Sequence, residues 1–171
     1  MKNRLGKFLF CLLISVVLTG CWQQEDTIRI KSDGTTTFES LVTITDDSMS
    51  LKDAEGLTSD FMKSLQNAGW KVEKKLLSEK KPIKHKFSGQ GNIRQVKNVN
   101  DSYRIEKVDE KNFTITFNSP SSKKGGRKGE SGRSIHFDQP FFGGARILDA
   151  QGKKVDSIPE VSRDLQYKIV F

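Results

Sequence analysis

The chain has 171 residues, with 29 basic and 21 acidic side chains and a formal net charge of +8. This length is enough for one domain with a real hydrophobic core, and no apolar stretch after residue 18 approaches the length of a membrane span. The two cysteines, Cys11 and Cys21, lie within or directly after an N-terminal apolar segment. If that segment is removed and Cys21 is modified, no thiol remains for a disulfide, a zinc cluster or a catalytic nucleophile.

The N-terminus has the three parts of a signal peptide. Three basic residues and no acid precede the apolar run "FLFCLLISVVL" at 8–18, which is too short to span a bilayer as a helix. The following "LTGC" at 18–21 resembles the lipobox of bacterial lipoproteins. This resemblance implies that a signal peptide over 1–20 is cut off, that Cys21 receives a diacylglyceryl group on its sulfur, and that the new amino terminus is acylated too.

A lipid anchor of this kind has physical consequences. Each buried methylene contributes about 0.8 kcal/mol, so two or three acyl chains make membrane attachment effectively permanent. The lipoprotein sorting rule reads the residue after the cysteine, and Trp22 in place of Asp favours the outer membrane, facing the periplasm, over the inner membrane. Loss of the three basic residues of the signal lowers the net charge of the mature chain to about +5.

The mature chain begins with a predicted β-hairpin. Residues 27–30 and 35–45 are rich in β-branched side chains, and Asp33-Gly34 between them is a strong turn signal. Alternation predicts that four side chains of the second strand share one face: Phe38, Ser40, Val42 and Ile44.

One helix is predicted, over about 54–69. Four apolar residues recur there at helical spacing: Leu57, Phe61, Leu65 and Ala68. Asp53 is a candidate cap at its start, and Gly69 stands where a left-handed helix end is expected. Trp70 is expected to pack back onto the helix.

The rest of the chain reads as strands. Seven segments carry strand patterns: 70–77, 81–89, 102–109, 112–118, 133–138, 145–150 and 165–171. The third and fourth of these are close enough to form a second hairpin, and Phe171 is expected to be buried in a sheet. Strands around one helix, without β-α-β alternation, predict an α+β domain over 21–171 with a mainly antiparallel sheet.

The stretch "SPSSKKGGRKGESGR" at 119–133 interrupts this pattern. It is rich in glycine, serine and positive charge and has no apolar residue to bury, so it predicts a flexible basic loop.

The first half of the mature chain is similar to the LppM-type lipoprotein domain. The similarity rests on a lipobox cysteine followed by a strand, a "DGT" turn, a second long strand and a helix ending in "AGW". That resemblance covers about residues 21–90 and implies no chemistry beyond the modification of Cys21.

Catalytic signals are few. His136 and Asp138 lie two residues apart on a predicted strand, so their side chains would share a face and could act as an acid-base pair. No further histidine, cysteine or carboxylate cluster completes a metal site, and the glycine-rich segments lack the spacing of a phosphate loop or a serine hydrolase elbow. We therefore expect no cofactor, and a small periplasmic enzyme using this pair is the alternative to a binding protein.

The basic residues favour a partner instead. Lysines crowd residues 71–86, and the loop adds five more positive charges: Lys123, Lys124, Arg127, Lys128 and Arg133. Such charges attract an acidic protein or anionic envelope glycolipids, whereas an exported protein seldom meets nucleic acid. The sequence thus predicts a membrane-anchored binding or structural module; an immunity-type inhibitor, which blocks a toxin delivered to the periplasm, is one case. A solvated basic face that aids solubility is the alternative for these charges.

Overall fold

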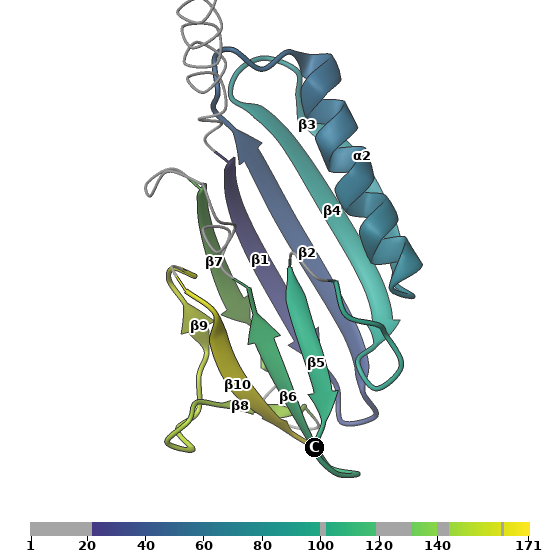
Figure 1. Cartoon of the computed structure of the whole chain (residues 1–171), viewed down its shortest axis with the longest axis vertical. Helices are drawn as coiled ribbons and strands as arrows, with labels where there is room; N and C mark the ends of the chain where they lie inside the picture. Colours follow the sequence, from purple (N-terminus) through teal and green to yellow (C-terminus); the bar gives the residue numbers. More distant parts are fainter. Residues whose placement is uncertain (1–21, 100–101, 119–130, 140–143, 162) are drawn as a thin grey trace, which may run out of the picture.

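The computed structural model describes residues 22–99, 102–118, 131–139, 144–161 and 163–171. Within them, ten strands form two sheets, and one helix lies beside the larger sheet (Figure 1). No helix among the described residues has the length and apolar character needed to cross a membrane. The predicted α+β class is confirmed, with β-structure predominant.

The large sheet has six strands in the order β3-β4-β2-β1-β7-β9. Their bounds are β1 (Trp22–Ile30), β2 (Thr35–Ile44), β3 (Lys71–Ser78), β4 (Ile83–Asn92), β7 (Ser131–Phe137) and β9 (Ser157–Ile158). All neighbours pair antiparallel except β1 and β7, which run parallel. The predicted first hairpin is confirmed: Gly34 adopts a φ of 85° in the β1–β2 turn, a conformation that glycine adopts without strain.

The small sheet has the order β5-β6-β10-β8 and is antiparallel. Its strands are β5 (Tyr103–Lys107), β6 (Asn112–Phe117), β8 (Arg146–Leu148) and β10 (Leu165–Val170). The predicted second hairpin is the β5–β6 pair, and Phe171 packs edge-on against Phe113 with a centroid separation of 5.6 Å. Two sheets thus form where one was expected.

The register of the large sheet brings four strand ends to one edge. Ile44 at the end of β2 pairs with Trp22 of β1 on one side and with Ile83 of β4 on the other. Trp22 also pairs with Ser131, the first residue of β7. We call this end of the sheet, which lies at the top in Figure 1, the Trp22 edge; the term refers to the ends of these strands and not to an outermost strand.

Helix α2 spans Leu51–Asn67, so it begins before the predicted start at 54. Ser50 is the N-cap, and Asp53, expected as the cap, instead completes a capping box: Ser50 Oγ accepts from the Asp53 N–H at 3.2 Å. The predicted buried face needs one correction, because Leu57 is 47% exposed while Ala54 and Thr58 are buried. At the other end Gly69 has a φ of 98°.

Helix α2 and the small sheet cover the same face of the large sheet. Phe61 of α2 meets Phe87 of β4 edge-on at 5.2 Å, and Phe117 of β6 lies 6.0 Å from Phe137 of β7. The core fills the space among these three layers. The opposite face of the large sheet is largely polar, as the alternating burial of its strands requires.

The basic loop predicted over 119–133 is wrong at its C-terminal end, and residues 119–130 lie outside the described residues. Residues 131–133 belong to β7, because its pairing with β1 runs along the whole of that strand. Arg133, counted among the loop's solvated charges, has a buried side chain with 8% exposure. The two-residue strand β9 was missed, since so short a segment has no readable periodicity.

Candidate functional site

Five of the residues that the sequence singles out lie outside the described residues. Cys21 directly precedes Trp22, where β1 begins. Lys123, Lys124, Arg127 and Lys128 lie in the segment between Asn118 and Ser131. Their roles in lipidation and partner binding therefore stay predictions, and the structure places only the residues that flank them.

The proposed acid-base pair is not assembled. His136 is exposed on β7, and Asp138 is bonded to Arg29 of β1 rather than to His136. Arg29 and Asp138 border a broad hollow of about 840 Å³ on the outer face of the large sheet, and His136 is absent from its lining. No group of three potential metal ligands occurs within the described residues.

A buried polar network lies instead on the inner face of the large sheet. Arg133 binds the Asp26 carboxylate through Nε at 2.8 Å and through a terminal nitrogen at 2.7 Å. A third nitrogen of Arg133 donates to the Ser102 carbonyl at 2.8 Å. Gln24 donates to both Asp26 oxygens, at 2.9 and 3.1 Å, and accepts from the Trp22 indole N–H at 3.3 Å. Strand β1 thereby positions three side chains on one face through its period of two.

The charges of this network are compensated within the fold. The Arg133 and Asp26 side chains are 8% and 5% exposed, so each depends on the other for neutralisation. Arg133 also lies over the Phe117 ring, 5.4 Å from its centroid. The network joins β1, β7 and the start of the small sheet, which makes it a fixed element of the interior.

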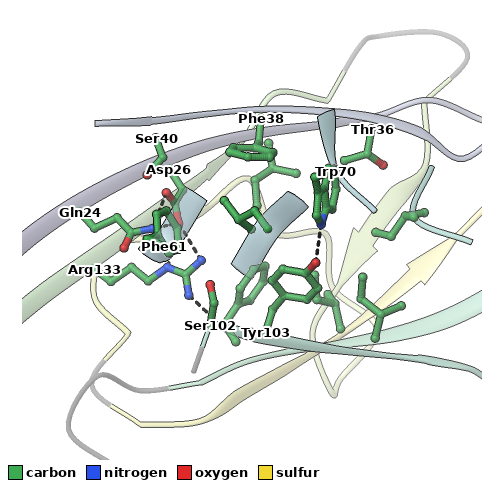
Figure 2. Close-up of a pocket in the computed structure, with 16 residues that line it drawn as sticks. Gln24, Asp26, Thr36, Phe38, Ser40, Phe61, Trp70, Ser102, Tyr103 and Arg133 are labelled. Carbon is green, nitrogen blue, oxygen red and sulfur yellow. Dashed lines mark hydrogen bonds and ion pairs between the residues drawn. The ribbon is translucent and has the colours of Figure 1, made fainter. Parts of the chain in front are cut away.

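A small cavity of about 50 Å³ extends from this network between the two sheets and α2. Figure 2 shows the charged groups at one end of it and the Trp70–Tyr103 hydrogen bond at the other. Burial raises the pKa of Tyr103 to about 12, and its hydroxyl donates to the Lys97 carbonyl at 3.0 Å. Ser40 Oγ, which has no hydrogen-bond partner among the described residues, also faces this cavity. A space of this size holds small groups such as water.

A much larger opening, also on the inner face of the large sheet, borders the same network and is open to solvent. We call it the Trp22 cleft; it has a volume of about 590 Å³, within the range of ligand sites. One wall is the C-terminal half of α2, the other is β1 with the connections of the small sheet, and Arg133 lies at its base. Its lining includes Trp22, Gln24, Phe61, Asn67, Asn98 and Ser102. Gln24, Phe61, Ser102 and Arg133 border both the cleft and the cavity.

Of the two histidines in the chain, His85 is buried. It lies on the inner face of β4, fully shielded from solvent, and neither ring nitrogen has a hydrogen-bond partner among the described residues. Burial is the main reason that its pKa lies below 6.5; the nearby charge of Lys74 lowers the pKa further, and Glu55 opposes this.

The lysines of residues 71–86 do not form one free basic surface. Lys74 donates to Ser59 of α2 at 2.9 Å, and Lys86 pairs with Glu39 at 2.9 Å. Lys81 pairs with Asp47 at 4.0 Å. Part of the positive charge that the sequence shows in this region is therefore compensated by neighbours from other elements.

Sequence reasoning missed the buried network because its members are far apart in the chain. Asp26 and Arg133 are separated by 107 residues, and only the parallel pairing of β1 and β7 brings them together. One signal was available: Gln24, Asp26 and Ile28 alternate at strand spacing ahead of the predicted strand 27–30, which would have extended that strand toward Trp22.

Comparisons with known proteins add no relative. No family model matches this chain, and no curated protein or solved structure matches it either. The similarity to the LppM-type domain therefore stays a prediction, and function must be argued from the chain's own residues.

Proposed function

We propose that this chain is a membrane-anchored lipoprotein of the cell envelope that acts as a binding module for a protein or an anionic envelope component. The support for the anchor is the signal-like N-terminus with "LTGC" ahead of Trp22. The support for binding rather than catalysis is that Asp138 is engaged by Arg29, so the best candidate acid-base pair has no shared hydrogen bond.

The observation that carries the proposal is the pairing of Trp22 with Ser131. Cys21 joins the fold at Trp22, and the segment with Lys123, Lys124 and its neighbours joins it at Ser131. The residues that directly follow the proposed anchor and the basic segment thus lie at the same edge of the large sheet. Basic residues close to an anionic membrane surface gain about 1 kcal/mol each, so this arrangement favours an anionic partner at that surface.

Substitution Cys21→Ala tests the anchor. We expect it to abolish incorporation of labelled palmitate and to leave uncleaved precursor, because the lipoprotein peptidase acts on the modified cysteine. The measurement is metabolic labelling with membrane fractionation. A variant that is still processed and still sediments with membranes would show that the lipobox interpretation is wrong.

Neutralising Lys123, Lys124, Arg127 and Lys128 together tests the binding role. We expect slower association with the partner recovered by crosslinking in cells, and a wild-type on-rate that falls as salt rises, since charges steer association over about 10 Å at 0.1 M ionic strength. The control variant neutralises Lys107, Lys111, Lys153 and Lys154, which lie elsewhere on the surface. Equal on-rates for the two variants at low and high salt would show that the basic segment is not part of the binding site.

A further inference from the structure

The Trp22 cleft presents two aromatic rings that are only partly covered. Trp22 and Phe61 both pack against the edge of the core while lining the cleft. The Trp22 indole N–H is bonded to Gln24, which is held by Asp26, so the ring is fixed before any ligand arrives. Such a preformed aromatic wall suits a ligand with an apolar C–H face, because the ring face carries partial negative charge and little entropy is lost on binding.

The polar groups of the cleft are mainly amides and hydroxyls. Gln24, Asn67, Asn98 and Ser64 line it, and each of these side chains can both donate and accept. Asn98 Oδ1 accepts from the Ile105 N–H at 2.7 Å, which holds that amide in place. The Asn67 side chain makes no hydrogen bond within the described residues. Groups of this kind match neighbouring hydroxyls, which also donate and accept.

The cleft has no uncompensated positive charge among its described lining residues. Arg133 at its base is neutralised by Asp26, and Asp60 at its rim lies 3.8 Å from Lys63. An anionic ligand would therefore find no free cation among these described residues. A strongly cationic ligand would find only the paired, exposed Asp60 carboxylate. A neutral ligand is favoured.

The cleft also offers no strand edge. Strand β1, which forms part of its wall, is hydrogen-bonded to β2 on one side and to β7 on the other. Peptides that bind in an extended form add to an unpaired strand, so that mode is closed here. A neutral ligand with hydroxyls and an apolar face, in a cleft of about 590 Å³, is an oligosaccharide of a few sugar units.

We propose that the Trp22 cleft is a binding site for a neutral oligosaccharide. The site is built by α2, β1 and the connections of the small sheet. None of the residues that would bind the sugar belongs to the basic segment, and none of them is the proposed lipidation site. The fixed Trp22 ring packs on the C–H face of one sugar, and the amides of Asn67 and Asn98 bind its hydroxyls.

The test uses the full-length chain in a detergent that has no sugar head group, applied to an array of neutral and acidic oligosaccharides. We expect retention on a set of neutral glycans, and protection of Trp22 from acrylamide quenching by the best of them, since Trp70 is already buried. Calorimetric titration with that glycan then compares Asn67→Ala with Gln66→Ala, an exposed amide beside it that does not line the cleft. Asn67→Ala should weaken binding about twofold to tenfold, the loss expected for one hydrogen bond, and Gln66→Ala should leave it unchanged.

Three outcomes would overturn this proposal. The first is that no neutral glycan is retained. The second is retention of acidic glycans alone, released by salt, which would assign binding to the basic residues. The third is glycan binding that leaves Trp22 unprotected or that both amide variants weaken equally. Because all these measurements are made in detergent, they are independent of the labelling test of Cys21, and either proposal can fail while the other stands.

Discussion

Arg133 is a charge that the fold removes from water, and its energetics depend on one partner. Its guanidinium donates twice to Asp26 and once to a backbone carbonyl, so its charge and three of its donors are satisfied. A buried pair of this kind adds little net stability over well-packed apolar residues, but a buried charge left alone is costly. Its value here is geometric, since it fixes the base of the Trp22 cleft.

The first prediction follows from this difference between the small net stability of a buried ion pair and the high cost of an unpaired buried charge. Asp26→Ala should lower the free energy of unfolding by about 3–5 kcal/mol, because it strands the Arg133 charge in the interior. Asp138→Ala removes the exposed partner of Arg29 and should cost less than about 1 kcal/mol. Urea titration of the two variants measures the difference. Equal losses would mean that Arg133 reaches solvent once Asp26 is absent.

The second prediction concerns His85, whose pKa in the fold is lowered mainly by burial and also by Lys74, with Glu55 acting in the opposite direction. The unfolded chain takes up a proton below about pH 6.5, whereas folded His85 does so only at lower pH. Stability should therefore be full above about pH 6.5 and fall as pH drops toward the folded pKa, by up to about 1.4 kcal/mol per pH unit.

The matched variants for this prediction are His85→Leu and His136→Leu, since His136 is exposed on β7. Denaturant titrations at about pH 7.5 and 5.5 stay above the range in which carboxyl groups titrate. The wild type and His136→Leu should lose stability between these values, and His85→Leu should lose less. The same loss in all three proteins would show that His85 is not the group responsible.

At the scale of the element, two glycines, one within α2 and one just after it, have opposite conformational requirements. Gly56 lies within the helix, and an added Cβ there would meet no atom within 4 Å. Gly69 follows the helix with a φ of 98°, which strains any side chain. Gly56→Ala should therefore stabilise the protein by about 1 kcal/mol, while Gly69→Ala should destabilise it by about 1 kcal/mol or more. Thermal unfolding of both variants checks the opposite signs.

The helix and the hairpins could be predicted well from local patterns, and the errors in their predicted bounds and buried residues have local causes. The β1–β2 hairpin, the helix and the β5–β6 hairpin follow from turn residues and periodicity within a few residues. The start of α2 was misplaced because two residues of the capping box, Ser50 and Asp53, both qualify as caps. Leu57 was assigned to the core by spacing alone, yet α2 contacts only one edge of the large sheet and leaves this position 47% exposed.

The candidate site could not be predicted in this way, because it depends on the whole molecule. The Trp22 cleft is lined by residues of α2, β1, β7 and the connections of the small sheet, and these segments lie far apart in the sequence. The parallel pairing of β1 with β7 decides which polar residues face one another. Sequence patterns give the face of each strand but not its neighbour, so the network of Asp26 and Arg133 appears only in the assembled fold.

At the scale of the whole molecule, the proposed lipid anchor would fix the orientation of the domain relative to the membrane. Trp22, Ile44, Ile83 and Ser131 lie at one edge of the large sheet, and the β1–β2 turn lies at the other. The ten residues of β2 join these edges, and a strand of that length spans about 30 Å. If Cys21 carries the lipid, the Trp22 edge should face the membrane and the β1–β2 turn should point away from it.

Two single-cysteine variants test this orientation. Lys80→Cys lies in the β3–β4 turn, at the Trp22 edge, and Ser32→Cys lies in the β1–β2 turn; both positions are exposed. After signal removal and acylation of Cys21, the new cysteine should be the one thiol open to a fluorescent maleimide. Energy transfer from this label to an acceptor dye on the lipid head groups should be clearly higher from position 80 than from position 32, because the strand length separates them. Detergent should abolish transfer in both. Equal transfer in intact membranes would mean that the domain lies flat or turns freely about its tether, and the Trp22 edge would then have no privileged access to a partner at the membrane surface.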